Sequence, residues 1–124
     1  MIVLVDSDIL IEVTRARDSA NLEKWSELAN SDDVLLCSPV SIAELWHGAR
    51  PREHQVIGDL FRALVCVPVD AETGRQAGDY LRTFHKSHGL ELGDALIAAC
   101  AVQNHATLWT RNRKHYPMKG LAFY

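Results

Sequence analysis

Short apolar runs alternate along this chain with stretches whose apolar residues recur at helical spacing. The first run, Met1–Val5, is continuously apolar, which is typical of a strand buried on both faces. The remaining runs are 34–37, 65–69, 107–110 and 121–124. Strands that alternate with helices form a parallel sheet covered on both faces. The pattern therefore predicts an α/β fold, with one domain over residues 1–124 and a central parallel sheet of four to five strands flanked by helices on both faces.

Capping residues mark where several of the helices begin and end. Ser7 or Asp8 is predicted to cap the helix after the first strand. Ser38 is predicted to cap the helix after the second strand, with Pro39 at its first position, where a missing N–H is harmless. Gly89 is predicted to end the long helix that precedes the last strands.

Three carboxylates stand where strand or helix signals meet turn signals. Asp6 ends the first apolar run, Glu44 lies about two turns into the helix after the second, and Asp94 heads a markedly apolar helix. Asn112 comes just after the run 107–110. Ligands of parallel sheets bind beyond the carboxyl ends of the strands. We therefore expect all four side chains to reach the same edge of the sheet.

A cluster of three carboxylates favours a bound cation. Two unit charges about 4 Å apart repel by about 4 kcal/mol at an effective dielectric near 20. Such a cluster either raises its pKa values or recruits a cation. Oxygen ligands without an accompanying Cys–His set favour Mg²⁺ or Mn²⁺ over zinc. A metal-activated water suits phosphodiester hydrolysis, and this is the reaction we predict.

The overall charge neither requires nor excludes a nucleic-acid substrate. The net charge is −3, so no bulk field attracts a polyanion. Basic residues nevertheless fall near the predicted site elements, namely Arg15, Arg17, Arg50, Arg52, Arg111, Arg113 and Lys114. Arg111 and Arg113 are the best candidates for contacts to substrate phosphates.

The chain has the features of a cytoplasmic protein. No stretch approaches the roughly 20 apolar residues of a membrane span, and the N-terminus enters a strand pattern without a signal segment. Cys37, Cys66 and Cys100 all lie in apolar patterns. This odd number of cysteines predicts packed free thiols and no disulfide framework.

Four segments of the chain resemble, in order, spacing and content, the motifs of PIN-domain proteins, and most closely those of VapC-type toxins from bacterial toxin–antitoxin pairs. These segments are 5–11, 41–48, 94–99 and 110–112. The resemblance spans nearly the whole chain. It implies an Mg²⁺- or Mn²⁺-dependent endoribonuclease that is usually a homodimer and is held inactive by a cognate VapB-type antitoxin.

The resemblance also implies roles for individual residues. Asp6 and Asp94 hold the main cation, and Glu44 holds it directly or through water. Asn112 stands where many relatives have Asp, so it orients water or a second cation that it binds more weakly.

Three further polar residues are candidates for supporting roles. Asp8 caps the first helix and stands close behind the metal site. The hydroxyl of Thr110 holds a water or ligand, or simply ends its strand. His115, where an acid is common in the family, contacts phosphate or is a partly exposed turn residue.

Two other functions remain open from the residues alone. Asp6-Ser7-Asp8 also fits a haloacid-dehalogenase-like small-molecule phosphatase, although that fold needs a later lysine that the chain does not offer after a strand. In a non-catalytic interaction module, the acids would instead bind arginines of a partner.

Overall fold

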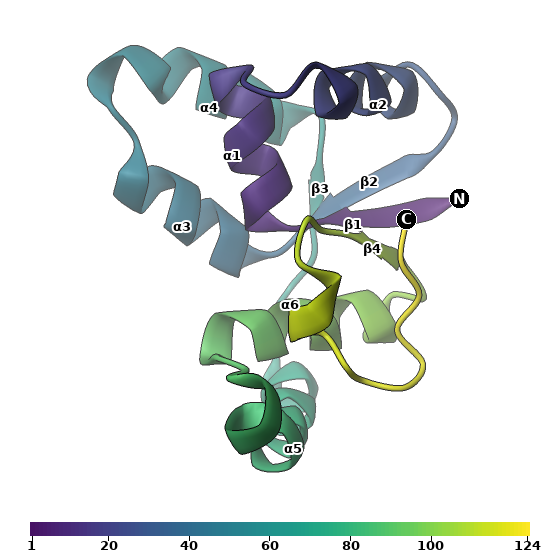
Figure 1. Ribbon diagram of the computed structural model, residues 1–124. Coiled ribbons are helices and arrows are strands. Elements are labelled where there is room, and N and C mark those ends of the chain that lie inside the picture. Colours follow the sequence, from purple (N-terminus) through teal and green to yellow (C-terminus); the bar gives the residue numbers. More distant parts are fainter.

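The computed structural model describes residues 1–124 and contains one four-stranded parallel sheet in the order β3-β2-β1-β4 (Figure 1). The strands are β1 (Ile2–Val5), β2 (Val34–Cys37), β3 (Val65–Cys66) and β4 (Thr107–Trp109). In the register, Val3 lies opposite Leu35 on β2 and opposite Thr107 on β4. The central strand β1 is thus paired on both edges, as its continuous apolar sequence predicts.

Six α-helices and two short 3₁₀ helices connect and cover the strands. The α-helices are α1 (Ser7–Arg15), α2 (Ser19–Ala29), α3 (Pro39–Gly48), α4 (His54–Arg62), α5 (Ala71–His88) and α6 (Leu92–Gln103). The 3₁₀ helices are η1 (Pro51–Glu53) and η2 (Arg113–His115). None of these helices is long and apolar enough to cross a membrane.

The sheet separates two hydrophobic cores. Val3 and Val5 of β1 pack into the core that includes Leu10 of α1, whereas Leu4 points into the core that includes Ile97 of α6. Successive side chains of a strand point to opposite faces, so one short strand supplies both cores. Helices α1 to α4 lie on one side of the sheet and α5 and α6 on the other (Figure 1). The predicted fold class is therefore confirmed.

Helix α6 is apolar almost all round, which is typical of a helix buried within a domain. Its residues from Ala95 to Ala101, apart from half-buried Leu96, are buried. The first turn of this helix carries Asp94. Its packing against the sheet consequently fixes the position of that carboxylate.

The structure corrects several details of the sequence prediction. The run 121–124 forms only an isolated bridge between Leu108 and Phe123, so the sheet has four strands. β3 stops after two residues, because its partner β2 ends at Cys37 and the chain then enters α3. Asp6, and neither Ser7 nor Asp8, caps α1. Cys66 is exposed because β3 is an edge strand; all three cysteines are free thiols.

Candidate active site

An acidic depression of about 150 Å³ lies beyond the carboxyl ends of β1 and β4. Its lining is mostly polar and consists of Asp6, Ser7, Asp8, Glu44, Asp94, Asn112, His115 and Tyr116. The four residues expected to converge, Asp6, Glu44, Asp94 and Asn112, are all among them. Asp6 follows β1, Glu44 lies on α3 after β2, Asp94 lies in the first turn of α6 after α5, and Asn112 comes shortly after β4.

Asp6 is the most deeply buried acid of the depression, and three donors hold its carboxylate. It directly follows β1, and its Oδ1 accepts the backbone N–H of Ser7 at 2.7 Å as the cap of α1. Its Oδ2 accepts the hydroxyl of Thr110 at 2.8 Å and that of Tyr116 at 2.7 Å. The side chain is thus fixed in orientation by the local turn and by two distant segments.

Tyr116 brings the two central acids together. Its hydroxyl lies 2.7 Å from Oδ2 of Asp6 and 3.4 Å from Oδ1 of Asp94. The ring is buried. A hydroxyl has a single proton to donate, so the shorter contact to Asp6 takes it and the longer one is weak. Asp6 and Asp94 therefore face the same point in space, which the phenolic oxygen occupies.

Two serines position the third acid. The hydroxyl of Ser7 lies 2.9 Å from Oε1 of Glu44 and 2.8 Å from the hydroxyl of Ser41. Ser7 and Ser41 are buried in the first turns of α1 and α3, whereas Glu44 is largely exposed. This link joins the two helices and directs the Glu44 carboxylate towards the depression.

Asp8 also lines the depression, and only one of its two carboxylate oxygens has hydrogen-bond donors. Its Oδ2 accepts the backbone N–H of Arg111 at 3.1 Å and is 3.4 Å from the hydroxyl of Thr110. Its Oδ1 is buried and has no hydrogen-bond partner. A buried carboxylate oxygen without a donor is unfavourable, and a cation or an ordered water would satisfy it.

The electrostatics of the depression raise several pKa values. Burial, followed by the charge of Asp8, raises the pKa of Asp6 to about 6, against the lowering effect of its three hydrogen bonds. Burial also raises the pKa of Asp8. The pKa of Glu44 is raised by partial desolvation and by the charges of Asp6 and Asp94. Burial and the Asp6 carboxylate raise the pKa of Tyr116, which stays protonated. Crowded carboxylates with raised pKa values are typical of functional sites.

The arginines expected to hold phosphates do not line this depression. The guanidinium of Arg111 forms an ion pair with Glu12 at 2.9 Å, because that buried carboxylate needs a cationic partner. Arg113 donates to the backbone carbonyl of Tyr124 at 3.0 Å and lies over the ring of Phe123. Both are thus directed elsewhere by tertiary contacts.

The other expected residues are found at or behind the depression. His115 is exposed on its rim, and the exposed Asn112 lies beside it. The backbone N–H of Asn112 donates to the hydroxyl of Thr110 at 3.1 Å. Thr110 itself lies behind Asp6 and connects it to Asp8 and Asn112. Its hydroxyl thus supports the acids from within the protein.

Four residues of the site and its support were not predicted from the sequence: Tyr116, Ser7, Ser41 and Glu12. Ser7 and Ser41 each stand one helical turn or less from an identified motif residue, so their proximity to Asp6 and Glu44 was a usable signal. Tyr116 carried no such signal, because it follows an irregular segment whose course the sequence does not specify.

The carboxylate oxygens of the depression fit a hard divalent cation as ligands. Mg²⁺ binds proteins through one or two carboxylates and completes its shell with waters and substrate phosphates. Asp6 and Asp94 supply two such carboxylates, and Asp8 has a buried oxygen without a donor. No group of three acidic, histidine or cysteine side chains is arranged as a complete metal site. The oxygen atoms of the Asp6, Asp8 and Asp94 side chains therefore fit Mg²⁺ or Mn²⁺.

Comparison with known proteins identifies the family. The model of the PIN domain matches residues 3–121. Ribonuclease VapC10 of Mycobacterium tuberculosis is 39% identical over 121 residues, which cover 94% of this chain and 86% of the relative. Ribonuclease VapC19 of the same organism is 32% identical over 116 residues, covering 93% and 92%.

Solved structures share the fold over the whole chain. The VapBC2 structure from Rickettsia felis, bound to a promoter DNA fragment, contains a chain with a TM-score of 0.80 and 24% identity, covering 100% of this chain and 98% of that one. The VapBC-1 structure from nontypeable Haemophilus influenzae gives a TM-score of 0.79 at 24% identity, covering 100% and 97%. The matched model, the relatives and the shared architecture together show that this chain belongs to the PIN domain family.

Proposed function

We propose that this protein is an Mg²⁺- or Mn²⁺-dependent endoribonuclease and the toxin of a VapBC-type toxin–antitoxin pair. The observation that carries the proposal is the convergence of Asp6, Glu44 and Asp94 in one depression at the carboxyl edge of the sheet. The similarity to proteins named ribonucleases VapC10 and VapC19 supports RNA as the substrate.

Asp6 and Asp94 would hold the cation, with Glu44 as a further ligand, directly or through water. When bound, the cation supplies activation of a water and neutralisation of the charge that develops on the phosphodiester. The hydrogen bonds from Ser7, Thr110 and Tyr116 hold the Asp6 carboxylate in a fixed orientation. Such support limits the reorganisation that the site needs during the reaction.

The remaining polar residues complete the site. The Ser7 hydroxyl fixes the Glu44 carboxylate at the edge of the depression, where it can accept a proton from an attacking water. Asn112 and His115 are exposed and also line the depression. Their side chains would orient a water and contact the substrate phosphate.

We further propose a VapB-type antitoxin as partner, a homodimer as the assembly and the cytoplasm as the location. The antitoxin is supported by the likeness of this chain to chains of the VapBC2 and VapBC-1 structures. Three free thiols accord with a reducing compartment. Light scattering of the purified chain would measure the assembly, and a mass near 13.9 kDa would contradict the dimer.

The decisive test is RNA cleavage by wild type and Asp94→Asn, each with Mg²⁺ and with excess EDTA. Wild type is expected to cleave RNA with Mg²⁺ and not with EDTA. The variant should cleave at least about 100-fold more slowly with Mg²⁺, because it lacks one of the two carboxylates that hold the main cation. The variant should keep its far-UV circular dichroism and lose the thermal shift that Mg²⁺ gives wild type. Equal cleavage by both proteins would contradict the assignment of Asp94.

The alternatives receive less support. The depression contains no lysine, which the phosphatase reading of Asp6-Ser7-Asp8 requires. Turnover of a generic phosphomonoester would nevertheless favour that reading. A non-catalytic interaction module predicts that Mn²⁺ gives neither heat nor a thermal shift on titration.

A further inference from the structure

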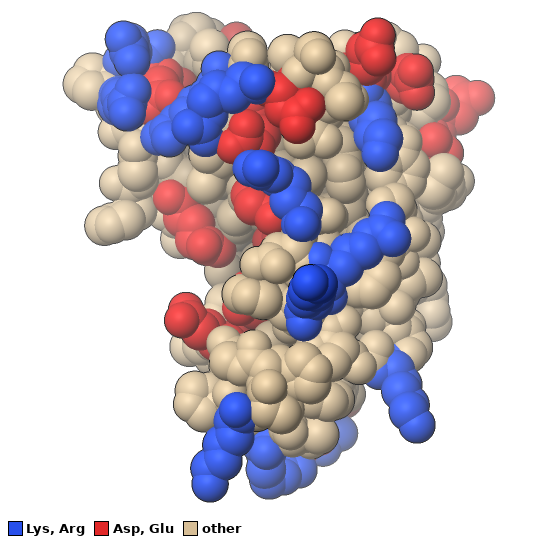
Figure 2. Space-filling view, viewed as in Figure 1, with Lys and Arg blue, Asp and Glu red and all other residues tan.

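Four arginines gather where α1 ends and the α3–α4 connection passes. They border a basin of about 400 Å³, here called the arginine basin. Its lining residues are Thr14, Arg15, Arg17, Arg50, Arg52, Glu53 and Val56. A group of basic side chains, with acidic ones between them, lies in the upper left of the molecular surface, over the region of α1 and α4 (Figure 2). The arginine basin is thus a basic region on a protein whose net charge is −3.

Two of the four arginines have no carboxylate partner. Arg15 pairs with Glu53 at 3.3 Å, and Arg17 pairs with Glu12 at 2.7 Å. The guanidinium groups of Arg50 and Arg52 form no ion pair, and both residues are exposed. Unpaired guanidinium groups are suited to phosphate, because their fixed fork of donors matches two phosphate oxygens.

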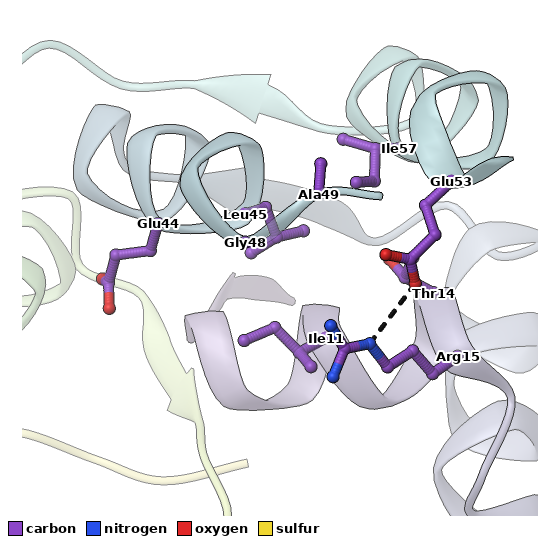
Figure 3. A pocket seen from close by; sticks show the side chains of 9 residues that line it. All are labelled: Ile11, Thr14, Arg15, Glu44, Leu45, Gly48, Ala49, Glu53 and Ile57. Atoms are coloured by element: carbon purple, nitrogen blue, oxygen red, sulfur yellow. Dashed lines mark hydrogen bonds and ion pairs between the residues drawn. The ribbon is translucent and has the colours of Figure 1, made fainter. Parts of the chain in front are cut away.

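A narrow furrow connects the basin to the acidic depression. It runs between α1 and α3, with Glu44 at one end and Arg15 and Glu53 facing each other at the other (Figure 3). It shares Glu44 with the depression, and Thr14, Arg15 and Glu53 with the basin. The acidic site and the arginines therefore lie on one continuous path.

The dimensions of this path suit the backbone of a nucleic acid. From Ser7 to Arg15, α1 rises by about 12 Å, which corresponds to roughly three to four stacked nucleotides. The furrow itself holds only about 40 Å³, enough for a few waters and too little for a base. A strand would thus lie across the furrow with its bases outside and its phosphates against the protein.

We infer that the arginine basin binds backbone phosphates of the single-stranded RNA substrate, three to four nucleotides from the bond that is cut. This rests on the proposed ribonuclease function and adds a second contact region to it. Arg50 and Arg52 make the contacts, whereas the charges of Arg15 and Arg17 are balanced by Glu53 and Glu12. Phosphate contacts carry no base information, so the basin strengthens binding to all sequences alike.

The test compares Arg50→Gln/Arg52→Gln with wild type in EDTA, where RNA is not cut. Fluorescence anisotropy of a labelled, unstructured RNA of about 12 nucleotides gives the dissociation constant from about 50 mM to about 200 mM salt. Each lost phosphate contact on a single strand lowers the salt slope of the logarithm of the binding constant by about 0.7. The salt slope of the double variant should therefore be smaller by about 1.4, and the variant should bind roughly 50-fold more weakly at the lowest salt.

Two further variants serve as controls. Arg75→Gln/Arg82→Gln removes the same charge from α5, on the other side of the sheet, and should leave the slope unchanged. Arg50→Lys/Arg52→Lys keeps both charges and should restore most of the slope. An unchanged slope in the Gln variant overturns the inference, and so does an equal loss in the α5 control. The inference is also overturned if the Gln variant binds RNA like wild type but no longer binds a poly-glutamate peptide.

A cleavage experiment locates the contact along the RNA. The cleavage site of one RNA substrate is first mapped, and single phosphates of it are then replaced by neutral methylphosphonate linkages. A replacement at one or two positions, about three to four nucleotides from the cut, should slow cleavage by wild type. The Gln variant should be insensitive at those positions, and interference that persists in it would overturn the inference. If wild type cuts no RNA, the proposed function fails, whereas the anisotropy result still decides whether the basin binds RNA.

Discussion

Replacing Asp6 with Asn is expected to stabilise the metal-free protein at neutral pH. The buried carboxylate has a pKa of about 6 in place of its ordinary 3.8. The folded state therefore holds a proton that the unfolded chain releases between these two values. The free energy of unfolding falls as pH rises through this window. Above about pH 6 the ionised carboxylate of Asp6 has its full destabilising effect. Each pKa unit corresponds to about 1.4 kcal/mol, so the penalty is about 3 kcal/mol.

Asn removes the charge and can keep the hydrogen bonds. Its amide oxygen can accept the backbone N–H of Ser7 as Asp6 Oδ1 does. Its NH₂ group then faces the hydroxyls of Thr110 and Tyr116, which can rotate and accept, because a hydroxyl is both donor and acceptor. The gain in the free energy of unfolding should approach about 3 kcal/mol at about pH 7.5 and vanish near pH 4.

Urea denaturation of both proteins in EDTA, from about pH 4 to about pH 8, measures this difference. Asp32→Asn is the matched control; Asp32 is exposed, so its substitution should change stability by less than about 0.5 kcal/mol at either pH. The reasoning is refuted if Asp6→Asn is less stable than wild type at about pH 7.5. A gain of equal size at both ends of the pH range would also refute it.

Two further substitutions test individual contacts. Tyr116→Phe removes the hydroxyl donor to Asp6 and should raise the pKa of that carboxyl further, as carboxyl NMR titration of the metal-free protein would measure; an unchanged pKa would show that the contact is absent in solution. Gly89→Ala places a side chain at a backbone φ of +64° and should cost about 1 to 2 kcal/mol in the free energy of unfolding, measured by urea denaturation. No other atom lies close to the added methyl group, so a larger loss would point to a cause other than backbone strain.

The fold was largely predictable because the signals for it are local. A continuously apolar β1 and alternating helix patterns specify a parallel sheet whatever the details of packing. Gly89 ends α5 in the left-handed conformation, and Ser38 and Pro39 open α3, as predicted. The extent of the strands at the edges of the sheet was less predictable, because it depends on which segments lie beside them. Residues 121–124 have strand-like sequence, yet they make only one bridge.

The candidate site was predictable in part for the same reason. Parallel strands bring their carboxyl ends to one edge, so the convergence of Asp6, Glu44 and Asp94 follows from topology. The directions of long side chains do not follow from topology. Arg111 and Arg113 stand beside Asn112 in sequence, but a buried Glu12 and the C-terminal segment attract them away from the depression.

The sequence by itself determined that an α/β domain would carry its acids at the carboxyl edge of a parallel sheet, because strand pattern and chain order are enough to set that geometry. Only the tertiary structure decided which groups surround those acids. The hydroxyl of Tyr116 lies between Asp6 and Asp94 because the segment after β4 folds back over the depression. The guanidinium groups of Arg50 and Arg52 form no ion pair, and Glu53, the carboxylate that lines the basin with them, is paired with Arg15 instead. Such contacts depend on distances between segments remote in the chain, which residue type and spacing do not encode.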